Sequence, residues 1–278
     1  MRGARLLASA ALLAAAPAAA APWQLPGSDV VSVEAPGGET YRVLVAWPDG
    51  PAPAEGWPVL WLLDGEDHFA AAAQTARRLA RGRGAPDVGA GLVLGIDAGP
   101  LSRRVFDYTP QIGQETISEG FPAQGLKPGG VGTFLAFLHD RVRLVIADRW
   151  PIDESRQTIA GHSFGGLAVL HDLRTVGGFN AYAAISPSLW FSDETERAKG
   201  RGSDSVELLL AVGTEEGGPS GNSVAAARDY AARAREQGVS TTVLTLPGAA
   251  HGDTMLHAMG AIVRLAFEAA GDEGRTQK

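Results

Sequence analysis

The stretch "TIAGHSFGGLAVLH" (residues 158–171) holds the most informative pattern in the chain. A short β-branched run precedes a G-x-S-x-G pattern centred on Ser163, and a segment with helical spacing follows it. A serine nucleophile held on a sharp turn needs this order of strand, turn and helix. Glycines flank such a serine because the strand and helix backbones approach closely there. The stretch alone also fits a glycine-rich strand-to-helix connection that contains a serine by chance, so the rest of the chain must decide.

Short apolar or β-branched runs bounded by Gly or Pro predict eight strands. Two of them, 58–63 and 206–212, are apolar on both faces, which is typical of strands buried between helices. The predicted strands are 29–35, 40–47, 58–63, 92–96, 158–160, 182–185, 206–212 and 240–246.

Helical patterns lie between these strands, and the alternation predicts an α/β fold with a mostly parallel central sheet and helices on both faces. The first two strands are expected to form an antiparallel hairpin. Residues 97–130 show no sustained periodicity and are expected to form a long loop that is either functional or disordered. The predicted helices are 68–81, 131–148, 164–174, 223–237 and 253–270.

The first residues are expected to direct export rather than to join the fold. Arg2 and Arg5 precede an apolar, alanine-rich stretch that ends in small residues, which is typical of a secretory signal peptide. We therefore predict a signal peptide over residues 1–21, a single α/β domain over residues 22–278, and a secreted or periplasmic location. No stable membrane span is expected in the mature chain.

Composition excludes several classes of function. The formal net charge is −7 and no run of five Lys or Arg occurs, so nucleic acid is not an expected partner. The chain has no Cys, which excludes disulfides, cysteine nucleophiles and cysteine zinc sites. Neither a metal ion nor a cofactor is expected, and the oligomeric state is open.

A serine nucleophile needs a base and a group that orients the base, and the C-terminal third supplies candidates for both. His251 follows the last predicted strand, and Glu215 and Glu216 follow the strand before it. Side chains at the carboxyl ends of parallel strands converge on one crevice. His251 is the favoured base because it alone follows both a strand and the acid; the choice between the glutamates stays open. The competing histidines are His68, His139, His162, His171 and His257.

An oxyanion hole is expected from two backbone N–H groups. One is that of Phe164, directly after the serine. The other lies in "LLDGEDHF" after the third strand, where Glu66 is the favoured donor.

The motifs "GHSFGGL", "AYAAISPSLWF", "LLDGEDHF" and "RRVFDYTP" together resemble an esterase family of the α/β-hydrolases. Within it, the chain is most similar to the siderophore esterases that open enterobactin-type trilactones. This resemblance implies Ser163 as nucleophile and His251 as base, and it favours Glu216 as the acid. It also implies that Arg104 or Arg103 contacts an anionic substrate. Trp190 is a candidate for the floor of the acyl pocket.

The favoured function is therefore an exported serine esterase acting on carboxylic esters of small molecules, with trilactone siderophores as candidate substrates. A general carboxylesterase or an acyltransferase of the same fold is the first alternative. A non-catalytic, ligand-binding relative of the hydrolases is the second.

Overall fold

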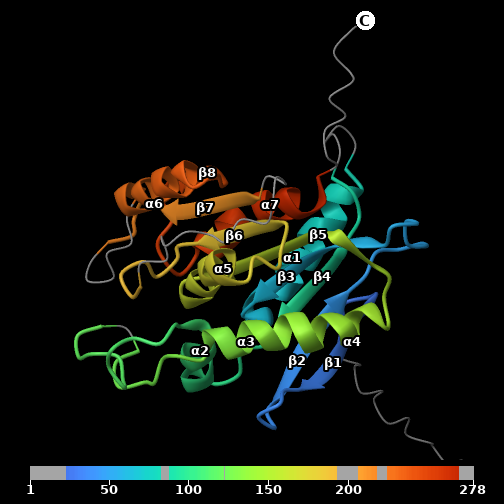
Figure 1. Ribbon diagram of the computed structural model, residues 1–278. Helices are drawn as coiled ribbons and strands as arrows, with labels where there is room; N and C mark the ends of the chain where they lie inside the picture. The colour runs from blue at the N-terminus through green and yellow to red at the C-terminus, as the bar shows by residue number, and fades with distance from the viewer. Residues whose placement is uncertain (1–22, 83–87, 122, 193–205, 218–223, 269–278) are drawn as a thin grey trace, which may run out of the picture.

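Eight strands form one sheet in the computed structural model, which describes residues 23–82, 88–121, 123–192, 206–217 and 224–268 (Figure 1). The order across the sheet is β1-β2-β4-β3-β5-β6-β7-β8. β1 and β2 form the predicted antiparallel hairpin, β2 pairs antiparallel with β4, and every other pair is parallel. The strands are β1 (Ser28–Glu34), β2 (Thr40–Ala46), β3 (Trp57–Leu63), β4 (Leu92–Ile96), β5 (Ile152–His162), β6 (Ala181–Ile185), β7 (Glu207–Gly213) and β8 (Ser240–Leu246).

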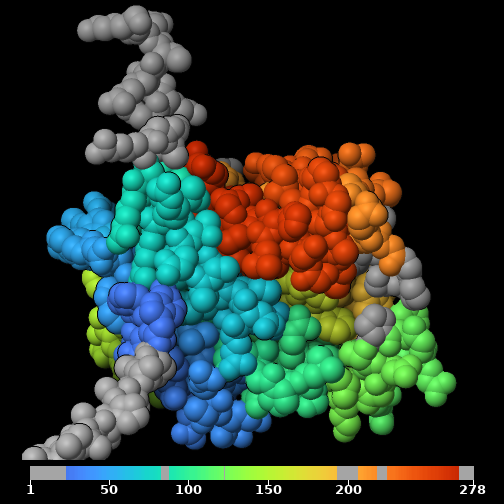
Figure 2. All heavy atoms as spheres, turned by 180° about the vertical axis from the view of Figure 1, so that it is seen from behind, coloured from blue at the N-terminus to red at the C-terminus, as the bar shows by residue number. Residues whose placement is uncertain are grey.

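Helices cover both faces of this sheet, as the alternating pattern predicts. Figure 2 shows α7 in red and α1 in cyan over one face; the remaining helices pack on the other. The helices are α1 (Gly65–Ala80), α2 (Leu101–Tyr108), α3 (Val131–Phe137), the π-helical turn η1 (Leu138–Val142), α4 (Arg143–Ala147), α5 (Phe164–Thr175), α6 (Val224–Glu236) and α7 (Thr254–Phe267).

Two apolar cores, one on each face, bury the sheet. Alternate residues of β3 divide between them: Leu60 and Leu62 point toward α1 and α7, while Trp61 and Leu63 point to the other side. All seven residues of β3 are buried, which explains the absence of polar alternation in its sequence.

Two sequence expectations are wrong in detail. The segment 97–130 is not wholly irregular, because α2 (Leu101–Tyr108) lies within it. β5 is also much longer than the predicted 158–160, since it begins at Ile152 and pairs with β3 across a register shift. The expected signal peptide, residues 1–21, lies outside the described residues and remains a prediction.

The parallel strands place their carboxyl ends along one edge of the sheet. β5 ends directly before Ser163, β7 ends shortly before Glu216, and β8 is followed by the loop that carries His251. Residues that are far apart in the sequence are thereby brought to one crevice.

Candidate active site

Ser163 occupies a strained turn between β5 and α5. Its backbone has φ 58° and ψ −117°, a conformation that costs a residue with a side chain about 1–3 kcal/mol. A Cβ at Gly161 would collide with the carbonyl of Gly165, so the strand and helix can approach this closely only with glycine there. Backbone hydrogen bonds hold the turn: Ser163 donates its N–H to Ile185, and its carbonyl accepts from Ser188. The turn therefore presents the Ser163 hydroxyl above the edge of the sheet.

Ser163, His251 and Glu216 form a continuous chain of hydrogen bonds. His251 Nε2 lies 3.0 Å from Ser163 Oγ, and His251 Nδ1 lies 2.9 Å from Glu216 Oε2. A carboxylate bonded to Nδ1 favours the tautomer with the proton on Nδ1, which leaves Nε2 free to accept from the serine. The imidazole is 42% exposed while the Glu216 side chain is 1% exposed, so the base faces the crevice and the acid lies beneath it.

Glu216 is held as an anion by several donors. Ser186 Oγ and the N–H of Gly213 donate to its Oε1, while His251 bonds to Oε2. Burial raises the pKa of this carboxyl, but these hydrogen bonds outweigh burial and keep the pKa below its usual value. Glu215, by contrast, is exposed and accepts from Thr214, so the structure brings Glu216 and not Glu215 to His251.

His162 supports the loop that carries His251. Its Nε2 lies 2.7 Å from the carbonyl oxygen of His251, and because a carbonyl only accepts, His162 is the donor. Burial, then the neighbouring His251, lower the pKa of His162 to about 4. His68 packs edge-on to His162, with 6.3 Å between the ring centroids, and burial likewise lowers its pKa. Elsewhere, His139 pairs with Asp172 in the fold.

The low pKa of His162 makes the free energy of unfolding depend on pH. In the unfolded chain His162 binds a proton near pH 6.5, whereas in the folded protein it does so only near pH 4. Its contribution is complete above pH 6.5 and is lost as the pH falls toward 4. Between pH 7 and pH 5, the free energy of unfolding of wild type should fall as His162 takes up a proton in the unfolded chain. We expect His162→Gln, which keeps a hydrogen-bond donor but cannot titrate, to show a fall that is about 1–2 kcal/mol smaller. Urea denaturation at both pH values measures this, and equal losses in the two proteins would contradict it.

The two expected oxyanion donors both lie in the first turn of a helix. Glu66 is the second residue of α1, and Phe164 is the first residue of α5. Backbone N–H groups in a first turn have no acceptor within the helix and point outward from its positive end. A Cβ on Gly165 would lie 3.3 Å from Asp64 Oδ2, so the turn after β3 packs directly on the start of α5.

The two arginines expected to contact substrate are engaged within the fold. Arg104 forms a bidentate pair with Asp64. Arg103 donates to Asp107 and Tyr41, with its guanidinium 4.7 Å from the Tyr41 ring centroid. Their charges are therefore already matched by carboxylates, which is a poor arrangement for binding an anionic substrate.

Trp190 lies beside the nucleophile turn. Its ring is 5.8 Å from that of Phe164 and stacks on Phe121, with centroids 5.3 Å apart and an interplanar angle of 8°. The Trp190 and Phe121 rings border a hollow lined by Ile112, Gly113, Gln114, Ile117, Ser118, Phe121, Trp190 and Phe191.

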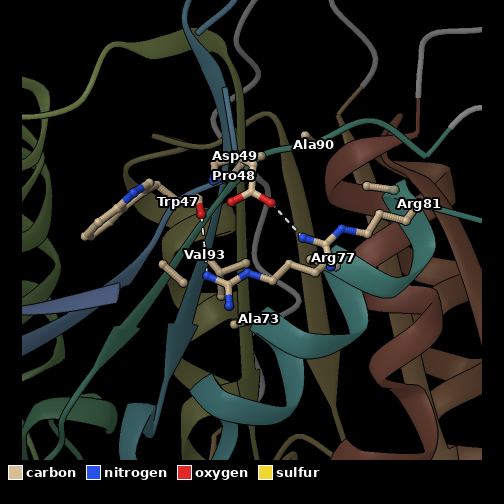
Figure 3. Close-up of a pocket in the computed structure, with 12 residues that line it drawn as sticks. Trp47, Pro48, Asp49, Ala73, Arg77, Arg81, Ala90 and Val93 are labelled. Carbon is tan, nitrogen blue, oxygen red and sulfur yellow. Dashed lines mark hydrogen bonds and ion pairs between the residues drawn. The ribbon is translucent and has the colours of Figure 1, made fainter. Parts of the chain in front are cut away.

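A separate pocket lies at the opposite edge of the sheet, between β2, β4 and α1 (Figure 3). Arg77 donates to the carbonyl of Trp47 there, and Arg81 pairs with Asp49. Arg77 belongs to the wall of this pocket.

Sequence reasoning missed several polar residues of the site. Ser186 has φ 45°, is fully buried and bonds to both Glu216 and Thr254. Ser188 places its Oγ 3.3 Å from Ser163 Oγ. Ser186 directly follows β6 and Ser188 lies two residues further on, so the rule that found His251, a position just after a strand, would also have found them. In the described part of the chain, no group of three or more His, Asp or Glu is arranged to hold a metal, and no helix is long and apolar enough to cross a membrane.

Comparisons with known proteins agree with this fold. Residues 35–251 match the model of a family described as "Putative esterase". The siderophore triacetylfusarinine C esterase of Aspergillus fumigatus is 29% identical over 86% of this chain and 86% of its own length. The ferri-bacillibactin esterase BesA of Bacillus subtilis is 30% identical over 69% of this chain and 72% of its own. Among solved structures, the BES protein of Bacillus cereus has a TM-score of 0.77 at 21% identity, covering 91% of this chain and all of the other.

A mostly parallel eight-stranded sheet with a Ser-containing turn after β5 defines an α/β-hydrolase. The predicted fold class is thus confirmed. The chain belongs to the esterase family that its residues 35–251 match, and it is a carboxylic ester hydrolase.

Proposed function

We propose that this protein hydrolyses siderophore esters through an acyl-enzyme formed on Ser163, with His251 as base and Glu216 as the acid that orients it. The observation that carries the mechanism is the hydrogen-bond chain from Ser163 Oγ through His251 to Glu216, with distances of 3.0 and 2.9 Å. The chain links a nucleophile, a base and a buried carboxylate in the geometry that acyl transfer requires.

In this mechanism Ser163 Oγ attacks the ester carbonyl carbon while His251 Nε2 takes the hydroxyl proton. The resulting oxyanion accepts from the backbone N–H groups of Glu66 and Phe164, each worth about 3–4 kcal/mol in the transition state. When the tetrahedral intermediate collapses, the C–O bond of the ester breaks and His251 returns the proton to the departing alcohol. Water then attacks the acyl-enzyme, His251 accepts its proton, and the carboxylic acid leaves as Ser163 is restored.

Two observations support a siderophore substrate. The relatives described above are named as esterases of triacetylfusarinine C and of ferri-bacillibactin. In addition, the stacked rings of Trp190 and Phe121 line the hollow described above, and Trp190 packs on Phe164, the buried residue directly after Ser163. Such a surface suits the flat aryl rings of a catecholate siderophore, because rings gain about 0.5–1.5 kcal/mol from stacking beyond the area they bury.

We expect Trp190→Ala to lower kcat/KM for a catecholate trilactone about tenfold, because one stacking surface is lost. The same variant should change kcat/KM for a short acetate ester less than twofold, since that ester does not reach the hollow. Trp23→Ala is the matched control, because Trp23 is 75% exposed and lines neither the hollow nor the crevice around Ser163. An equal loss of kcat/KM for both substrates would show that the aromatic hollow does not bind the siderophore.

The substrate class is tested by assaying the purified protein against an enterobactin-type trilactone beside short- and long-chain nitrophenyl esters. Linear products from the trilactone, at a kcat/KM above that of the simple esters, are expected. Efficient turnover of the simple esters with no hydrolysis of the trilactone would contradict the siderophore substrate. The protein would then be a general carboxylesterase.

We also propose that the protein acts after export, in the periplasm or outside the cell. The support is the sequence of residues 1–21, with Arg2 and Arg5 ahead of an apolar stretch. Mass analysis of the protein recovered from a periplasmic fraction should show these residues removed. Recovery of the full-length chain only from the cytoplasm would contradict export.

A further inference from the structure

Asp64 occupies a strained position between the proposed oxyanion turn and Arg104. It follows β3 directly, has φ 54° and ψ 53°, and is only 6% exposed. Arg104 Nε lies 2.6 Å from its Oδ1 and Arg104 Nη2 lies 2.8 Å from its Oδ2, so the pair is bidentate. The N–H of Asp64 donates to the hydroxyl of Tyr108, whose ring lies 5.5 Å from the Arg104 guanidinium.

The same guanidinium also contacts the nucleophile turn. Arg104 Nη2 donates to the carbonyl of His162 at 3.2 Å. One planar group thus bonds to the residue before Ser163 and to Asp64, which lies two residues before the proposed oxyanion donor Glu66. Because a guanidinium presents its N–H groups in a fixed geometry, it holds these two turns at one separation.

We propose that Arg104 is a positioning residue whose pair with Asp64 holds the Gly65–Glu66 turn against the His162–Ser163 turn. This inference rests on the proposed mechanism, since it concerns the spacing between the nucleophile and its oxyanion donors. It replaces the direct contact with an anionic substrate that the sequence resemblance implies for Arg104. Asp64 already neutralises the guanidinium, which is only 20% exposed.

The two roles differ in what they do to different substrates. A positioning residue affects every ester through kcat, because the oxyanion is common to all of them. A residue that binds anions affects only anionic esters, chiefly through KM. The test compares a neutral acetate and an anionic hemisuccinate of the same nitrophenol with wild type, Arg104→Met, Asp64→Asn and the double variant.

Arg104→Met is expected to lower kcat about 10²-fold for both esters, with KM within twofold of wild type. Affinity for a boronic acid that forms a tetrahedral adduct with the serine should fall by a similar factor. Asp64→Asn is expected to reproduce this loss, and the double variant should be no worse than either single variant, because both changes remove one interaction. Arg81→Met, which breaks an exposed pair at the opposite edge of the sheet, should leave kcat unchanged.

The folding of each variant is checked by its thermal midpoint. The double variant leaves neither charge buried alone, so it reports on kcat even where Arg104→Met is unstable. A KM increase restricted to the hemisuccinate, or wild-type kcat in the double variant, would overturn the positioning role. Wild-type protein that neither turns over the esters nor forms an adduct on Ser163 would instead overturn the proposed mechanism.

Discussion

Replacing Ser163 with alanine is expected to lower kcat for ester hydrolysis by about 10⁵- to 10⁶-fold. The reason is that removing the nucleophile of such a site leaves only the contribution of the oxyanion donors and substrate binding. The fold should persist, because the change removes one hydroxyl, which bonds to the 42% exposed His251 imidazole and lies 3.3 Å from the Ser188 hydroxyl. Steady-state kinetics with a nitrophenyl ester, together with the thermal midpoint, measures both effects.

Ser188→Ala is the matched control, because its hydroxyl lies 3.3 Å from Ser163 Oγ in the same crevice. A loss of less than about tenfold is expected, since this hydroxyl contacts the nucleophile but is not bonded to His251. Activity above 1% of wild type in Ser163→Ala, with a near-complete loss in Ser188→Ala, would contradict Ser163 as the nucleophile and point to Ser188 instead.

Replacing Glu216 with glutamine is expected to lower kcat by about 10⁴-fold, with KM little changed. Glutamine fills the same space, but its amide lacks the charge that stabilises the protonated His251 and no longer fixes the Nδ1–H tautomer. The change also disturbs the hydrogen bonds from Ser186 and Gly213 to the buried carboxylate. Kinetics across pH 6–9 measures the loss.

Glu215→Gln provides the control from the neighbouring residue. Glu215 is exposed and its carboxylate accepts from Thr214, so we expect kcat within twofold of wild type. If Glu215→Gln instead lost activity and Glu216→Gln kept it, the acid would belong to the exposed residue and the loop after β7 would have to rearrange in the active protein.

The sequence predicts the fold well because its signals are local. β4 and β8 have the predicted bounds, since each is a short apolar or β-branched run between turn residues. β5 is longer than predicted because residues 153–156, which lie across the register shift in its pairing with β3, are polar and give no apolar signal in the sequence.

α2 was missed because its stabilising contacts are not local. Within Leu101–Tyr108, the arginines and Asp107 interrupt the apolar pattern, yet each is paired with a partner from another element. Arg104 meets Asp64 across forty positions of sequence. A pairing of that range leaves no periodic signal, whereas the substrate contact expected of Arg104 is implied only by the family resemblance.

The sequence predicts those residues of the candidate site that lie directly after strands. The order of Ser163, a glutamate and His251 after successive strands indicated one crevice, and the structure brings these residues within hydrogen-bonding distance. The choice of glutamate depended on where β7 ends. Because β7 ends at Gly213, three residues of loop return the Glu216 carboxylate to the Gly213 N–H and to His251.

Rapid-quench mass spectrometry shows whether Ser163 carries the acyl group of a siderophore ester during turnover. The wild-type enzyme is mixed with an enterobactin-type trilactone, quenched in acid within milliseconds and digested with trypsin. Cleavage after Arg156 and Arg174 yields the peptide 157–174, which contains Ser163. We predict that this peptide gains the full mass of the trilactone, since opening a ring leaves the alcohol attached to the acyl chain. An adduct on any other peptide would contradict the account.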